Sequence, residues 1–167
     1  MSRSGYSDDI DDILMLGRWR GMVTSATRGK RGHKLFKDLL EALDAMPVKE
    51  LIDEVLEDSE GVCALGCLGK KRGLDMTNLD PEEPELVAKA FDIAPCLAQE
   101  IVFENDEAGP YGGETPSERW IRIRKWVSEQ IKRGIKMNGK SYRLDYDNAK
   151  TKGDGEDIKY FPDLVEE

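Results

Sequence analysis

Two of the three cysteines, Cys63 and Cys67, lie four residues apart in the apolar stretch EGVCALGCLGKKRG. On a helix this spacing places both thiols on one face, where they could share a metal ion. A structural zinc site needs about four ligands, and the other candidates, Cys96 and the single histidine His33, lie far away in the sequence. No histidine lies close enough in sequence to activate either thiol as a nucleophile. We therefore expect packed cysteines, with no metal, no cofactor and no catalytic residue.

Acidic residues gather in two stretches that contain few bases. Residues 38–60 hold nine acids against one lysine, and residues 74–118 hold twelve acids against one lysine. No phosphate-binding loop, dinucleotide fingerprint or hydrolase motif accompanies them. We expect non-enzymatic binding through an acidic surface, which offers carboxylates where nucleic-acid phosphates would otherwise sit. The predicted partner-binding residues are Asp53, Glu54, Glu57, Glu100, Glu104, Asp106, Glu107 and Tyr111.

Basic residues form two blocks of their own. Residues 13–37 hold seven bases and no acid, and residues 119–140 hold eight bases against one acid. Glycine-spaced arginines can wrap phosphates while Trp19 stacks on a base. The plainer interpretation is that these charges pair with the acidic helices. The alternative function is therefore a nucleic-acid-binding module that uses segments 18–37 and 119–140. Its predicted contacts are Arg18, Arg20, Arg28, Lys30, Arg31 and Lys34.

The stretch ELVAKAFDIAPCLAQEIV has the layout of a helix-turn-helix, with Asp92 where glycine is commonest. Its second helix carries four carboxylates and no base over residues 95–107. A helix in the major groove faces densely spaced phosphates, which would repel these carboxylates. We interpret the two segments as packed helices of a core.

The elements that position these residues are predicted to be helices, because apolar residues recur with helical spacing through most of the chain. The helix over 60–72 is the central one, since residues 62–68 are apolar on every side, with Asp58 or Ser59 as its cap. A glycine-rich loop is predicted over 28–32. The other predicted helices cover about 8–27, 33–46, 48–59, 81–91, 95–105 and 115–134.

These patterns together predict a mainly α-helical, compact single domain with a C-terminal β-hairpin and an acidic tail. Residues 1–133 form the predicted helical domain, and residues 134–167 form the hairpin, marked by Asn138-Gly139, and the tail. The motif YFPDL at 160–164 is a candidate for docking on the domain or on a partner. No apolar run approaches the roughly 20 residues of a membrane span, and no signal-peptide pattern opens the chain, so we expect a cytoplasmic protein.

Four stretches of the chain resemble a family of small, uncharacterised proteins encoded by phages and prophages. They are RWRGMVTSATRGKRGHKLFKDLLEALDAMP, VCALGCLGKKRG, FDIAPCLAQEIVFENDEAGP and ETPSERWIRIRKWV. The likeness covers about residues 10–133. It implies only the setting, that of a phage accessory protein. In that setting, the acidic surface leads us to expect binding to a host protein or a defence nucleoprotein complex, with inhibition as the candidate effect. The family supplies no catalytic residue to carry over.

Overall fold

The computed structural model describes the backbone of residues 13–111 and 113–138, and the side chains of residues 14–111 and 113–133. This part of the chain is mainly helical, as predicted, with an isolated bridge between Glu57 and Val62 in place of any strand. The tail and the hairpin from Gly139 onward lie outside the described residues. The six helices are α1 Ile13–Arg28, α2 Lys30–Ala45, α3 Ala64–Arg72, α4 Pro84–Phe91, α5 Pro95–Asp106 and α6 Pro116–Asn138.

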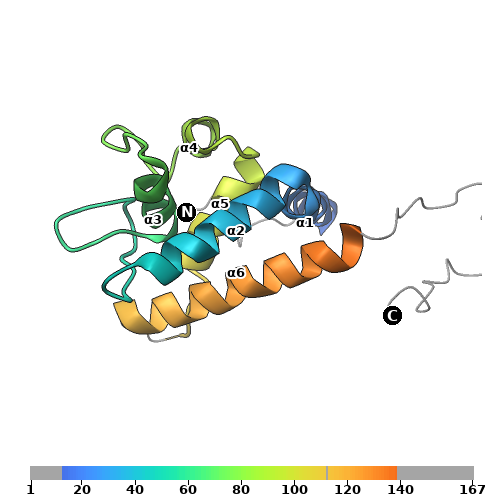
Figure 1. Cartoon of the computed structure of the whole chain (residues 1–167). Coiled ribbons are helices and arrows are strands. Elements are labelled where there is room, and N and C mark those ends of the chain that lie inside the picture. The colour runs from blue at the N-terminus through green and yellow to red at the C-terminus, as the bar shows by residue number, and fades with distance from the viewer. Residues whose placement is uncertain (1–12, 112, 139–167) are drawn as a thin grey trace, which may run out of the picture.

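Helices α2 and α6 pack side by side and antiparallel (Figure 1). Arg124 near the start of α6 bonds Asp44 at the end of α2, with Nε and Oδ1 2.5 Å apart. Further along, the rings of Phe36 and Trp126 meet edge to face with centroids 5.3 Å apart. Consequently the start of α2 and the end of α6 lie at the same end of the molecule, where α1 also joins α2.

Helix α3 is enclosed by its neighbours, as its sequence predicts. Every residue from 62 to 69 is buried, and α3 packs against α2 and α5. The buried core around α3 includes residues of every other described helix except α1, whose partly buried Ala26 packs against it. Its largest fully buried side chains are Leu35, Phe36, Leu39, Leu43, Leu51, Leu65, Leu68, Val87, Phe91, Leu97, Ile101 and Ile123.

The helix predicted over 48–59 is wrong. The structure has a loop there, in which two successive backbone N–H groups bond to carbonyl oxygens outside the segment instead of four residues back. Leu51 donates to the carbonyl oxygen of Pro116 and Ile52 to that of Val62, both at 3.1 Å. Leu51 is thereby fully buried. Tertiary hydrogen bonds and the burial of Leu51 and Leu56 override the helical spacing of this stretch.

The loop predicted over 28–32 is also wrong, because Gly29 alone separates α1 from α2. Gly29 has an extended backbone and supplies the sharp bend. A Cβ at Gly32 would overlap the carbonyl oxygen of Ala26, so the absence of a side chain there lets the two helices meet at a tight elbow.

The cap of α3 differs from the prediction. Cys63 occupies the cap position, and its Sγ accepts from the N–H of Gly66 at 3.4 Å. Asp58, one of the two predicted caps with Ser59, instead closes the preceding turn by accepting from the N–H of Glu60 at 2.7 Å.

Helix α6 begins as predicted and ends later. Its capping box forms, since Glu118 accepts from the N–H of Thr115 at 2.8 Å and Thr115 Oγ1 accepts from the N–H of Glu118 at 3.3 Å. The helix continues through Gly134, its predicted end, to Asn138. It therefore includes residues 135–138, which the hairpin prediction placed in a strand and turn.

The interpretation of α4 and α5 as packed core helices is confirmed. Asp92 ends α4 in the left-handed conformation with φ 53°, and Pro95 opens α5. Leu97, Ile101 and Val102 of α5 are buried against the other helices. Because α5 is enclosed by other helices in this way, it does not project from the surface as a helix that enters a DNA groove would.

Candidate functional site

The acids predicted on α5 do not form an exposed surface. Glu100 is buried, with its side chain 9% exposed, and one of its oxygens is 3.4 Å from Nη1 of Arg20. Its other oxygen, Oε2, is buried without a hydrogen bond. Glu104 is half-buried and lies 4.0 Å from Nη1 of Arg122. Glu100 is therefore turned inward and is not displayed on the surface where the predicted partner contact would need it.

Burial sets the protonation of this inward pair. Burial, with the neighbouring Glu104 as a smaller cause, raises the pKa of Glu100 to about 7. Burial also raises the pKa of Glu104, although the nearby Arg122 and Arg20 oppose this and Glu129 on α6 adds to it. A small cluster of opposite charges thus lies between α1, α5 and α6, and one of its carboxyls titrates near neutral pH.

We predict that Glu100 makes stability depend on pH. Its folded pKa lies above the ordinary value of 4.5, so the folded chain holds a proton that the unfolded chain has lost. The free energy of unfolding should therefore fall as pH rises from about 4.5 to about 7, by roughly 2–3 kcal/mol. In Glu100→Gln the part of this decline that comes from Glu100 should be absent.

Urea unfolding of both proteins at a series of pH values measures this effect. The two proteins should have similar stability near pH 5, and the variant should be the more stable near pH 8. Parallel profiles across the whole range would show that Glu100 is ionised in the folded chain.

A second polar network, which the sequence did not reveal, ties the loop over 47–63 to α5 and α6. Arg119 is buried and donates to the carbonyl oxygen of Leu51 at 3.0 Å and to Asp53 at 2.7 Å. Glu114 joins Arg119 at 3.3 Å and also bonds Arg122. These bonds satisfy groups that would otherwise be buried unpaired, so we assign the network to stability.

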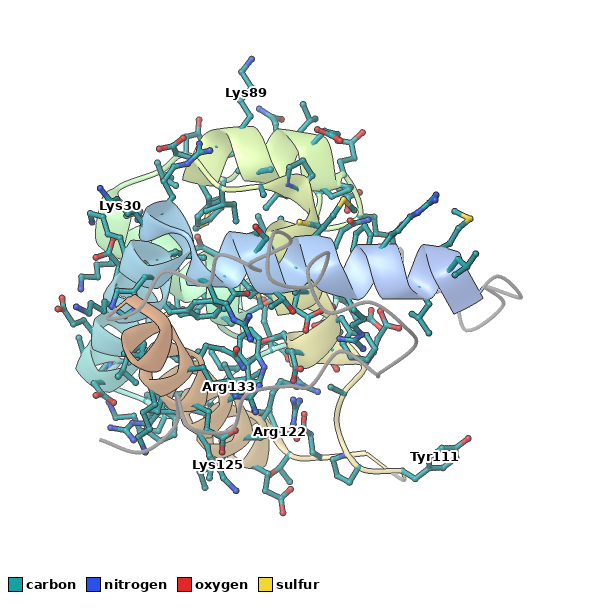
Figure 2. All side chains as sticks on the ribbon, turned by 90° about the vertical axis from the view of Figure 1, so that its right-hand side faces the viewer. Lys30, Lys89, Tyr111, Arg122, Lys125 and Arg133 are labelled. Carbon is teal, nitrogen blue, oxygen red and sulfur yellow. The ribbon has the colours of Figure 1, made fainter. Side chains whose placement is uncertain are left out.

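The remaining predicted residues lie mostly at the surface, and several of the acids among them are held by partners. Asp53 belongs to the network above, and Glu57 pairs with Lys70 at 2.7 Å. Asp106 accepts from the side chain of Asn105 at 2.6 Å. Glu54 and Glu107 are exposed, and so is Tyr111, the one predicted residue that is not an acid. The ring of Tyr111 projects from the loop after α5 (Figure 2). The structure therefore does not gather the eight predicted residues into one acidic patch.

Three of the six predicted basic contacts are held in ion pairs with described residues. Arg20 pairs with Glu100, Arg31 with Asp92 at 3.3 Å, and Lys34 with Asp38 at 2.7 Å. The other three, Arg18, Arg28 and Lys30, are exposed and make no ion pair with any described residue.

Six exposed cations without an ion pair in the described part of the chain follow the elbow, α2 and α6. We call them the basic surface; they are Arg28, Lys30, Lys37, Lys125, Lys132 and Arg133. Figure 2 looks onto the end where α2 begins and α6 ends. Lys30 lies at the elbow, Arg133 lies near the end of α6, and Lys125 lies about two turns nearer the start of that helix. The antiparallel packing of α2 and α6 brings together two basic blocks that are about a hundred residues apart in the sequence.

An open groove of about 680 Å³ extends this surface along the outer side of α6. Trp120 lies in it, with Lys49 Nζ 5.2 Å and the guanidinium carbon of Arg124 5.8 Å from its ring centroid. The sequence marks this region only as a basic segment, because Lys49 contacts the indole from another part of the chain. The α6 groove is lined by Asp44, Lys49, Trp120, Ile121, Arg124, Lys125, Ser128, Glu129 and Lys132.

The cysteines are placed as expected for packed residues. Burial raises the pKa of Cys63 to about 12 and that of Cys67 to about 11, so neither thiol forms a ready nucleophile. Cys96 is buried in α5. Within residues 13–111 and 113–138, no group of three or more histidine, cysteine or carboxylate side chains is arranged to hold a metal ion.

Comparison with known proteins adds no family. No protein-family model, curated protein or solved structure matches this chain. Among the helices of the described residues, none is long and apolar enough to cross a bilayer.

Proposed function

We propose that this chain is a non-enzymatic binding protein that holds a nucleic-acid backbone on its basic surface. The observation that carries the proposal is the set of six exposed cations that no described carboxylate engages. Each such cation can replace a condensed counterion on a phosphate, and the release of that counterion favours binding. Cations already held in ion pairs would have to give up a partner first.

The net charge of −9 does not argue against this ligand, because the charges are separated in space. The basic surface follows the elbow, α2 and α6, whereas many acids lie in the loops over 47–63 and 74–83. A local positive field steers an anionic ligand to one face even when the whole molecule is negative. Repulsion by the acidic remainder would favour one orientation of the bound strand.

The acidic-surface hypothesis receives less support from the positions of its residues. Capture of a basic partner requires exposed carboxylates, and Glu100, Glu104 and Asp53 are each turned inward or paired. The setting implied by the resemblance, an accessory protein of a phage acting in its host, is compatible with either ligand and stays a prediction.

The test is charge reversal on α6. We expect the triple variant Lys125→Glu, Lys132→Glu and Arg133→Glu to bind labelled mixed-sequence DNA and RNA at least about tenfold more weakly at low salt. The log–log salt dependence should become shallower by about 2–3 for three lost phosphate contacts. Folding should be nearly unaffected, because the three side chains are exposed and unpaired. Fluorescence anisotropy across a salt series measures both quantities.

Lys89 supplies the matched control. It is an exposed cation without an ion pair in the described residues, and it lies on α4 across the molecule from Lys125 (Figure 2). Lys89→Glu changes the net charge as much as Lys125→Glu does, yet it should leave affinity nearly unchanged. Equal losses in these two single variants, or full binding by the triple variant, would contradict a localised basic site.

A further inference from the structure

We propose that the acidic tail, residues 145–167 of the same chain, occupies the α6 groove and competes there with nucleic acid. The competition rests on the proposed function, whereas the docking of the tail does not. The inference rests on two neighbouring features. The groove along α6 is both cationic and apolar, and the chain that continues beyond the end of α6 carries an acidic, aromatic stretch at 145–167.

Charge complementarity is the first argument. Residues 145–167 hold eight acidic residues against three lysines. The groove offers four cations against two acids. No described carboxylate engages its Lys125 or Lys132, and of the two acids Asp44 is held by Arg124, whereas Glu129 lines the groove as well. An acidic peptide can therefore take the cationic positions that a phosphate backbone would take.

Apolar complementarity is the second argument. Ile121 lies in the groove with 61% of its surface exposed, beside the partly buried Trp120. The tail carries apolar residues between its acids, so it can cover this surface in a way that a purely acidic peptide cannot. They are Ile158, Tyr160, Phe161, Leu164 and Val165.

Reach is the third argument. At 1.5 Å per residue, the groove from Lys132 back to Trp120 lies about 9–27 Å from the end of α6 at Asn138. Residues 139–153 span up to about 50 Å when extended. The chain after α6 is thus long enough to return along the helix and lay residues 154–167 in the groove.

The consequence is a lowered apparent affinity. If the tail covers the groove nine-tenths of the time, the apparent dissociation constant for nucleic acid rises about tenfold. The docking is itself electrostatic, so the effect should be largest at low salt and fade as ions screen the charges.

The experiment uses the full chain with three tail acids neutralised, Asp154→Asn, Glu156→Gln and Asp157→Asn. This tail-neutral variant should bind labelled single-stranded DNA about three- to tenfold more tightly than the wild type at low salt, with the gain shrinking as salt rises. The matched control neutralises Glu60, Glu83 and Glu85, which are exposed and unpaired among the described residues. This control changes the net charge equally and should leave affinity within about twofold.

A second measurement tests docking without nucleic acid. A labelled peptide of residues 145–167 should bind the tail-neutral variant, and Lys125→Glu with Lys132→Glu in that background should abolish the binding. Lys89→Glu should not. Absence of peptide binding together with equal DNA affinities of wild type and tail-neutral variant overturns the tail inference and leaves the basic surface in place. Peptide binding by a chain that binds no nucleic acid in either form overturns the proposed function and leaves the docking in place.

Discussion

Gly66→Ala is expected to destabilise the domain by about 3 kcal/mol or more, although it adds a single methyl group. A Cβ at this position would overlap the carbonyl oxygen of Leu56. That oxygen accepts from the N–H of Cys63 at 3.1 Å, so the loop cannot retreat without breaking the bond that holds it to α3. Backbone has to move, and Gly66→Leu should be worse still. The free energy of unfolding in urea measures the cost.

Two other glycines provide the control. Gly17 and Gly21 lie within α1, and a Cβ at either would meet nothing within 4 Å. Because glycine is a poor helix former, Gly17→Ala and Gly21→Ala should each stabilise the chain by up to about 1 kcal/mol. Cys63→Ala should fall between these extremes, since it loses a small buried side chain. If Gly66→Ala resembles Gly17→Ala, then α3 is not closed against the loop as the structure has it.

Local signals made several helices predictable from sequence. The strong apolar stripe of α2, the capping box of α6 at Thr115 and the proline that opens α5 at Pro95 all act within a few residues of chain. The enclosure of α3 was likewise visible, because a run of residues that is apolar on every side has no face to show to water.

The features that sequence missed depend on partners distant along the chain. Residues 48–59 have helical spacing, yet Leu51 donates to Pro116, 65 positions away, and the segment becomes a loop. Glu100 belongs to an acidic stretch that suggests exposure, and packing by α1 and α6 turns it inward. Periodicity describes which residues share a face, but it does not say which face another helix will cover.

The candidate site illustrates the same limit. Segments 18–37 and 119–140 were both predicted as basic, but ion pairing decides which of their charges are available to a ligand. Arg124 pairs with Asp44, and Arg119 belongs to the buried network. Lys125, the residue after Arg124, and Lys132, about two turns further along α6, make no ion pair with a described residue. Which cation is free follows from how α2 lies against α6, and a sequence gives no such packing directly.

Asn105→Ala should also be strongly destabilising, by about 3–5 kcal/mol. Asn105 is 2% exposed, and it connects three segments of the chain. Its Oδ1 accepts from the N–H of Ala64 at 3.1 Å, at the buried start of α3, and its Nδ2 donates to the carbonyl oxygen of Ile52 at 2.9 Å. Alanine removes both partners at once and leaves a backbone donor and a backbone acceptor unsatisfied away from water. Unpaired buried groups of this kind cost about 1–3 kcal/mol each, beyond the lost packing of the side chain.

Urea unfolding gives the total cost of Asn105→Ala, and amide hydrogen exchange locates it. Because the N–H of Ala64 loses its acceptor, exchange should accelerate at the start of α3 more than in α2 or α6, whose ladders do not involve Asn105. The matched control is Asn78→Ala, an asparagine exposed in the loop between α3 and α4, which should change stability by less than about 0.5 kcal/mol. A cost for Asn105→Ala no larger than that of the control would mean that water satisfies both backbone groups. The join between α3, α5 and the loop over 47–63 would then be held by apolar packing alone.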